Sequence, residues 1–226
     1  MEAIQFETED HVVLEGEIRL PERGSRGAAV LCHAHPQHGG SKDHPLLWAT
    51  RIELARREFA VLAFNFRGVM GSGGSYGGGE AELADVWAAV GRANELADGP
   101  TLLCGWSFGA HVGLRAALED DRVDALALIG LPLSEAGPAM PPMPDIDEMA
   151  GFDRPVLLMA GDADPFCPAA ELRALGRKLP RATVRVVPGA DHYFSRRERE
   201  AAAIVGLLAS ELLPPPGHRG KKTMAR

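Results

Sequence analysis

The chain has few cysteines and no framework for disulfide bonds. Three cysteines occur among 226 residues, and an odd number without paired spacing is not typical of a disulfide scaffold. Cys32 and Cys104 lie in apolar runs that indicate core strands, so we expect them to be small buried hydrophobic residues. This cysteine usage favours a reducing compartment and predicts a cytoplasmic protein.

Long hydrophobic runs are also missing. Apolar stretches such as residues 201–209 fall well short of the roughly 18 residues that cross a bilayer as a helix. The first residues, MEAIQ, are acidic and carry no basic segment ahead of an apolar one, so we expect no secretion signal. These absences predict a protein without a membrane partner.

Basic residues are not in excess either. Lys and Arg number 24 against 31 Asp and Glu, which gives a formal charge of −7. This modest acidity argues against nucleic acid as a partner. What the chain does have is 46% hydrophobic residues, enough for a sizeable core, and a length that suits one domain.

Short apolar runs alternate with helix-like segments along most of the chain. Residues 2–8 and 11–20 alternate apolar and polar side chains, which predicts an antiparallel hairpin at a sheet edge. The later alternation predicts an α/β fold, a mostly parallel sheet with helices on both faces. We expect one domain over 1–213 and a disordered, Pro-rich and basic tail over 214–226. Strands are expected at 28–33, 59–64, 101–104, 125–129, 155–160 and 183–187, and helices at 46–57, 80–97, 110–118, 168–179 and 196–213.

The stretch GWSFG at residues 105–109 is the most informative motif. It follows the apolar run 101–104 and precedes the helix-forming run 110–118. This order of strand, G-x-S-x-G and helix is the setting of a nucleophile elbow, which lifts the oxygen of Ser107 above the sheet edge. The start of the helix adds free backbone N–H groups and a positive dipole end. Taken alone, the motif also fits a Gly-rich turn that happens to contain serine.

A nucleophilic serine needs a base, and the base needs an acid that orients it. The strand expected at 155–160 runs into Asp162 and Asp164, and the strand at 183–187 runs toward His192. Acid and base therefore follow strand ends, where the sites of parallel sheets assemble. We expect His192 to be the base. Asp164 is favoured as the acid because a proline follows it and holds it extended, whereas Asp162 is placed to bond its own turn.

At these motifs the chain resembles the α/β-hydrolase superfamily, over roughly residues 2–213. The segments LCHAHPQHGG at 31–40 and FNFRG at 64–68 look like those of small, lidless bacterial proteins of the dienelactone-hydrolase-like or esterase-like kind. The resemblance implies an α/β-hydrolase fold without a large lid domain, with a serine, aspartate and histidine triad and no cofactor. One departure is Met70, where the resembling loop leads us to expect glycine.

The residues HAHP at 33–36 match the H-G-x-P turn of the resembling family. There the loop after the third strand supplies a backbone N–H to the oxyanion hole. The resemblance implies that the N–H groups of His35 and Phe108 form this hole and that the bond between His35 and Pro36 is cis. We expect His33 to be a buried, hydrogen-bonded support.

A zinc-dependent hydrolase is the alternative from another class. His33, His35 and His38 have the spacing of imidazole ligands that could hold zinc. However, Gln37 stands where the H-x-H-x-D-H metal motif has its aspartate, and glutamine is a poor zinc ligand. We therefore favour the oxyanion turn and expect no bound metal.

The substrate pocket is the least predictable part of the site. Trp106 could line it or simply pack, and Arg67 could contact substrate or brace a nearby loop. Met140 and Met143 lie in segment 131–154, where larger members of the superfamily insert a lid. This segment is too short for a helical domain, and it could form either an apolar flap or a plain surface crossover.

These residues predict a serine esterase that cleaves small-acyl esters through an acyl-enzyme on Ser107. A small-molecule ester is then the expected partner, and the missing lid predicts a preference for short acyl chains. A thioesterase or a small peptidase would use the same residues. A non-catalytic binding scaffold is disfavoured, because it has no need of all three triad residues.

Overall fold

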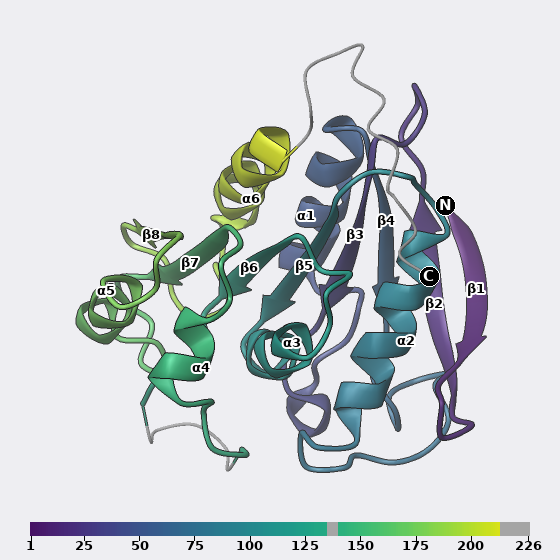
Figure 1. The fold of residues 1–226 in the computed structure, drawn as a ribbon, viewed down its shortest axis with the longest axis horizontal. Coiled ribbons are helices and arrows are strands. Elements are labelled where there is room, and N and C mark those ends of the chain that lie inside the picture. The colour runs from purple at the N-terminus through teal and green to yellow at the C-terminus, as the bar shows by residue number, and fades with distance from the viewer. Residues whose placement is uncertain (135–139, 213–226) are drawn as a thin grey trace.

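A computed structural model describes residues 1–134 and 140–212 of the chain. The predicted tail at 214–226 lies outside the described residues. The sheet has eight strands in the order β1-β2-β4-β3-β5-β6-β7-β8 (Figure 1). The strands are β1 Glu2–Glu7, β2 Val13–Arg19, β3 Gly27–Cys32, β4 Phe59–Phe64, β5 Thr101–Trp106, β6 Ala125–Ile129, β7 Val156–Gly161 and β8 Ala182–Val187.

The first two strands form the antiparallel hairpin that the alternating pattern predicts. β1 pairs with β2 at one edge of the sheet, and β2 pairs antiparallel with β4. From β4 onward every neighbouring pair is parallel. The predicted fold class, a mostly parallel sheet, is therefore confirmed.

Helices cover both faces of this sheet. One hydrophobic cluster lies beneath α2, α3 and α5, and the other beneath α1 and α6. Figure 1 shows α2 and α3 in front of the sheet and α1 behind it. Leu102 and Leu103 are neighbours in β5 but belong to different clusters, because successive side chains of a strand point to opposite faces. The helices are α1 Pro45–Arg56, α2 Glu82–Asn94, α3 Phe108–Leu118, α4 Ile146–Ala150, α5 Ala169–Gly176 and α6 Glu198–Leu212.

Burial explains why the central strands read as continuous apolar runs. β3, β4, β5, β6 and β7 are buried at every position, as expected of strands covered on both faces. β8 lies at the sheet edge and alternates between exposed and partly buried residues. The cysteines Cys32, Cys104 and Cys167 are buried and free, as predicted for the two in core strands.

Two short elements were not predicted. The 3-10 helix η1 covers Pro36–His38, and α4 covers five residues of segment 131–154. The described part of that segment contains no helical domain, which agrees with the predicted absence of a large lid. Its stretch 135–139 lies outside the described residues, so the structure does not decide between the apolar flap and the plain surface crossover that the sequence allowed.

Loops that follow the parallel strands gather along the lower edge of the molecule in Figure 1. The loop between β4 and α2 contains Met70, which is 72% exposed and has a backbone φ of 49°. This left-handed conformation favours glycine, and it accounts for the glycine expected there from the resembling loop. In the described ranges, no helix combines the length and the apolar character that crossing a bilayer requires.

Candidate active site

Ser107 occupies the sharp turn between β5 and α3. Its φ and ψ are 55° and −116°, and its N–H donates to the carbonyl of Ile129 at 2.8 Å. A non-glycine residue at positive φ is uncommon and strained. The flanking glycines allow the turn, because a Cβ at Gly105 would collide with the Gly109 carbonyl and one at Gly109 with the Cys32 carbonyl. The predicted elbow geometry is therefore present.

His192 bridges the serine and the acid. Its Nε2 lies 2.9 Å from Ser107 Oγ, and its Nδ1 lies 2.8 Å from Asp164 Oδ2. The second oxygen of Asp164 accepts hydrogen bonds from the N–H groups of Phe166 and Cys167, at 2.9 and 3.1 Å. A carboxylate beside Nδ1 places the imidazole proton there and leaves Nε2 to accept the proton of the serine hydroxyl.

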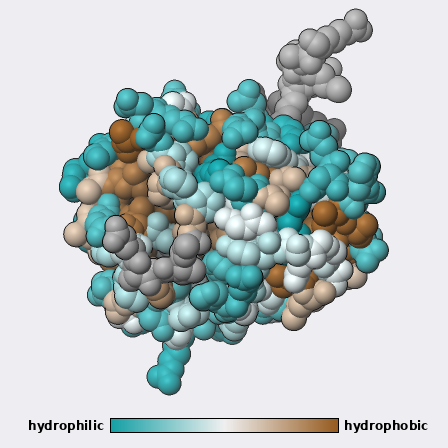
Figure 2. Space-filling model, turned by 90° about the horizontal axis from the view of Figure 1, so that it is seen from below, coloured by the Kyte–Doolittle hydropathy of each residue, from teal (hydrophilic) through white to brown (hydrophobic). Residues whose placement is uncertain are grey.

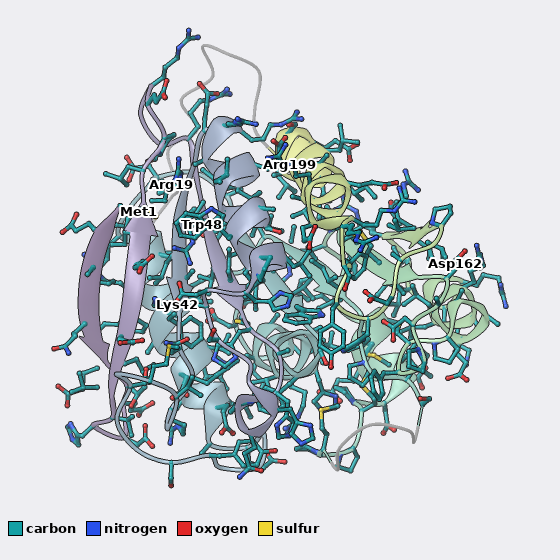
Figure 3. The ribbon with its side chains drawn as sticks, turned by 180° about the vertical axis from the view of Figure 1, so that it is seen from behind. Met1, Arg19, Lys42, Trp48, Asp162 and Arg199 are labelled. Carbon is teal, nitrogen blue, oxygen red and sulfur yellow. The ribbon has the colours of Figure 1, made fainter. Side chains whose placement is uncertain are left out.

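The structure separates the two neighbouring acids. Asp164 is 5% exposed and contacts His192. Asp162 is exposed, and its Oδ1 accepts the N–H of Gly189 at 2.7 Å. Figure 3 shows Asp162 at the outer side of the sheet beside β8. Asp164 is therefore the acid that contacts His192, whereas Asp162 accepts a bond from the turn after β8 and not, as predicted, from its own turn.

The two residues whose N–H groups are the expected oxyanion donors have neighbouring side chains. The rings of His35 and Phe108 are 5.1 Å apart between centroids. Phe108 is the first residue of α3, where the helix leaves N–H groups without an intrahelical acceptor. Among the described residues, neither the Phe108 N–H nor the His35 N–H donates to a protein group. Both N–H groups thus lack a protein acceptor in the part of the chain that is described.

The predicted cis bond between His35 and Pro36 is wrong. The described residues contain no cis peptide bond. The turn is closed instead by η1, in which trans Pro36 takes the first helical position, where a missing N–H costs nothing. His35 caps this helix with a φ of −51° and a ψ of 122°, an extended conformation that suits a residue before proline. The turn therefore forms without the cis bond.

The histidines of this turn use their ring nitrogens in hydrogen bonds. His33 donates from Nδ1 to the Ala34 carbonyl at 2.6 Å and accepts the Phe66 N–H at Nε2. Burial lowers the pKa of His33 to about 4, so the ring stays neutral. His35 accepts the Gln37 N–H at Nδ1, and its Nε2 bonds the Tyr76 hydroxyl. No lone pair is left on His33 for zinc, which contradicts the three-histidine metal site. The predicted supporting role of His33 fits these bonds.

A pocket of roughly 100 Å³ opens beside the triad. Its wall includes Ser107 and His192 of the triad and the two expected oxyanion residues, His35 and Phe108. Two of the four predicted pocket residues, Trp106 and Met140, also line it. Trp106 is buried and donates from Nε1 to the His192 carbonyl at 3.0 Å, so it also holds the loop of the base. Met143 packs against the hydrophobic cluster beneath α2, α3 and α5 and does not line the described pocket.

Arg67, one of the possible pocket residues, does not line the described pocket wall. Its guanidinium bonds Asp10 at 2.7 and 3.0 Å and Asp85 at 2.8 Å. Its backbone N–H also donates to Asp85. Arg67 therefore braces the loop after β4 against α2 and the turn of the N-terminal hairpin. This was the other interpretation that the sequence allowed.

Sequence reasoning missed several residues of the pocket wall. His44, Phe166 and Tyr193 line it, and each stands beside a recognisable feature. His44 precedes the proline that starts α1, Phe166 follows Asp164 by two residues, and Tyr193 follows His192. Figure 2 views the lower edge of Figure 1, and hydrophobic residues gather there on the side of β7 and α4.

The fold and this arrangement of side chains define the class of protein, an α/β hydrolase without a lid domain. A family model described as an alpha/beta hydrolase domain matches residues 27–211. The chain therefore belongs to the α/β-hydrolase family.

Known proteins resemble the chain in sequence and in structure. An uncharacterized protein of Rickettsia prowazekii (strain Madrid E) is 25% identical over 180 residues, which cover 76% of this chain and 74% of that protein. A putative α/β hydrolase of Agrobacterium tumefaciens has a TM-score of 0.80 and 26% identity, with 95% of this chain and 100% of that chain covered. A serine hydrolase without lid from Xanthomonas campestris has a TM-score of 0.78 and 24% identity, with 94% and 95% covered.

Proposed function

We propose that this hydrolase cleaves small carboxylic esters through an acyl-enzyme formed on Ser107. The observation that carries the proposal is the unbroken chain of hydrogen bonds from Ser107 through His192 to Asp164. Two of its members, Asp164 and His192, are almost fully buried, at 5% and 6% exposure. A serine that hydrogen-bonds an oriented imidazole is the arrangement that activates a hydroxyl for attack on a carbonyl.

The proposed reaction has two halves. Ser107 Oγ attacks the ester carbonyl while His192 Nε2 takes the hydroxyl proton, and a tetrahedral oxyanion forms. The C–O bond to the alcohol then breaks, and His192 returns its proton to the leaving oxygen. A water molecule attacks the acyl-enzyme with His192 again as the base, which releases the acid and restores Ser107. Asp164 stays ionised and keeps the imidazole oriented.

The backbone N–H groups of His35 and Phe108 are the proposed oxyanion donors. Their lack of other acceptors in the described protein and the ring contact between the two residues support this role. Removal of one such donor in a comparable site costs about 3 kcal/mol of transition-state stabilisation. The positive end of the α3 dipole, at Phe108, would also stabilise the negative charge of the oxyanion.

The size of the pocket supports a preference for short acyl chains. A cavity needs about 10–15 Å³ of such space to hold one water molecule. The roughly 100 Å³ beside Ser107 therefore accommodates on the order of ten non-hydrogen atoms at most. A small-molecule ester fits this space, and a long acyl chain would extend beyond it.

The test measures turnover of p-nitrophenyl acetate with and without a fluorophosphonate that labels active serines. We expect labelling at Ser107 and loss of activity on labelling. EDTA should leave the activity unchanged. Activity that resists the phosphonate but is lost to EDTA would contradict the serine mechanism.

A matched pair of variants tests the acid. Asp164→Asn should lower kcat by about four orders of magnitude through a wrongly oriented imidazole. Asp162→Asn removes the same charge two residues away and should leave kcat within a few fold, because the amide oxygen of asparagine can still accept the Gly189 N–H. The opposite ranking of the two variants would reassign the acid.

A further inference from the structure

His44 is a pocket residue whose tautomer the fold determines. It caps the N-terminus of α1, and its Nδ1 accepts the N–H of Leu46 at 3.3 Å. A nitrogen that accepts a hydrogen bond carries the lone pair, so in the neutral ring the proton lies on Nε2. The cap therefore leaves His44 with one N–H donor at the opposite end of its ring.

The ring of His44 is held in place by the residue beside the nucleophile. It stacks on Trp106 with 4.1 Å between centroids and 33° between planes. Trp106 is itself fixed by its bond to the His192 carbonyl. Burial lowers the pKa of His44, while the carboxylate of Glu198 acts weakly in the opposite direction. No ion pair joins His44 to Glu198 among the described residues, so the ring is a neutral donor.

The other imidazoles of the pocket wall differ from His44. Both ring nitrogens of His192 are used within the triad, and both of His35 are used by Gln37 and Tyr76. His38 lies exposed at the surface. In the described part of the chain, Nε2 of His44 has no protein partner, and it is not among the buried atoms that lack one. This N–H is therefore open to solvent on a residue that lines the pocket.

We propose that His44 is a specificity-determining residue whose Nε2–H binds an acceptor oxygen of the substrate. The inference rests on the proposed esterase function and narrows its substrate class. The preferred esters carry, besides the ester group, an ether, keto or hydroxyl oxygen within a few bonds of the scissile carbonyl. The second oxygen lies on either the acyl or the alcohol side, and the same N–H would recognise it in both cases.

The physical reason is the cost of leaving a donor unpaired. An aliphatic chain that displaces water from Nε2–H gives nothing in exchange, whereas an ether oxygen restores the hydrogen bond. A neutral hydrogen bond contributes about 0.5–1.5 kcal/mol. Since about 1.4 kcal/mol is a factor of ten, we expect up to roughly a tenfold preference in kcat/KM.

The experiment compares esters that differ only by exchange of CH₂ for oxygen. For the acyl side the pair is p-nitrophenyl methoxyacetate and p-nitrophenyl butyrate. For the alcohol side it is 2-methoxyethyl acetate and butyl acetate. Each enzymatic ratio of kcat/KM is divided by the ratio of hydroxide-catalysed rates, which removes the intrinsic reactivity of the carbonyl. The wild type should prefer the oxygen-containing ester by up to about tenfold in at least one pair.

Two variants separate the N–H from the rest of the residue. His44→Phe keeps an aromatic ring against Trp106 but has no donor. His44→Ser keeps a side chain that can cap α1 but has no ring. Both variants should bring the corrected ratio to about one. If His44→Phe fails to fold because it has lost the helix cap, His44→Ser still provides the test.

A corrected ratio near one in the wild type, or a preference that survives in both variants, would overturn the proposal. These outcomes differ from failure of the esterase function, in which neither ester pair is turned over and the phosphonate labels no serine. The role of His44 and the reaction itself are thus tested by separate readouts.

Discussion

At the scale of single residues, two buried histidines differ in how their rings are satisfied. His111 in α3 is 1% exposed, and neither of its ring nitrogens has a hydrogen-bond partner among the described residues. His33 is equally buried but uses both nitrogens. Burial lowers the pKa of each to about 4. An unpaired buried polar group costs about 1–3 kcal/mol, so His111 should destabilise the fold and His33 should not.

Replacing His111 with leucine should therefore stabilise the protein. We expect the free energy of unfolding at pH 7 to rise by about 1 kcal/mol, because the desolvated nitrogens are removed and leucine is a better helix former. The measurement is urea unfolding followed by circular dichroism. His33→Leu is the matched control and should lower the free energy of unfolding by about 1–3 kcal/mol, since it leaves the Phe66 N–H and the Ala34 carbonyl without their partner.

The increase in the free energy of unfolding on replacing His111 with leucine should be larger at acidic pH than at pH 7. The folded pKa of about 4 lies below the ordinary value of 6.5, so between these values the unfolded state binds the proton and the folded state does not. The free energy of unfolding of the wild type is therefore unaffected by protonation of this ring above pH 6.5 and decreases as the pH falls from 6.5 toward 4. The difference between variant and wild type should widen by up to about 3 kcal/mol. An equal difference at pH 7 and pH 5 would show that the ring protonates without unfolding.

At the scale of elements, the Gly-rich loop before α2 supports the oxyanion turn. Tyr76 of this loop bonds His35 at 3.1 Å, and its ring lies 5.0 Å from that of His35 and 5.9 Å from that of Phe108. The loop is anchored by the buried carboxylate of Glu82, which accepts the N–H groups of Gly77 and Gly79 at 2.7 and 2.8 Å. Tyr76 thus contacts the side chains of both proposed oxyanion residues, and it is a candidate positioning residue.

Tyr76→Phe should lower kcat about fivefold and leave KM nearly unchanged, because the lost hydrogen bond, worth about 1 kcal/mol, orients donors used mainly in the transition state. Tyr76→Leu also removes the ring contacts and should cost more. A trifluoromethyl ketone forms a tetrahedral adduct with serine. Its affinity should decrease in proportion to kcat/KM in both variants. A change confined to KM, with unaltered ketone affinity, would place Tyr76 in ground-state binding instead.

Long elements were predictable from sequence, and short ones were not. The strands and helices around Ser107 follow from apolar runs and from the glycines of the elbow, which are local signals. η1 and α4 cover three and five residues, too few for a periodic pattern to appear. Their caps also give little warning, since histidine is not a preferred N-cap residue and Asp145 follows a Pro-rich stretch.

At the scale of the whole molecule, the sheet brings the site together from distant parts of the chain. Ser107, Asp164 and His192 follow β5, β7 and β8, which end at the same edge. Their order and positions were predictable because each follows its own strand. The role of Arg67 was not, because its partner Asp10 is 57 residues away in the sequence. The wall of the pocket, including His44, depends on loop conformations that no local pattern specifies.

The domain should end close to the C-terminus of α6. Among the described residues, the hydrophobic cluster beneath α1 and α6 reaches into α6, where the last fully buried residue is Ala209. A chain shortened to residues 1–213 should therefore have a free energy of unfolding within about 0.5 kcal/mol of that of the full chain. Its kcat/KM should be unchanged. Removal of the four basic residues of 214–226 changes the formal charge from −7 to −11, so the short chain should elute from an anion exchanger at higher salt.

Truncation after Gly206 is the control and should destabilise the fold by several kcal/mol, because it also removes Leu208 and Ala209. A loss above about 1 kcal/mol in the 1–213 chain would show that residues 214–226 pack on the domain.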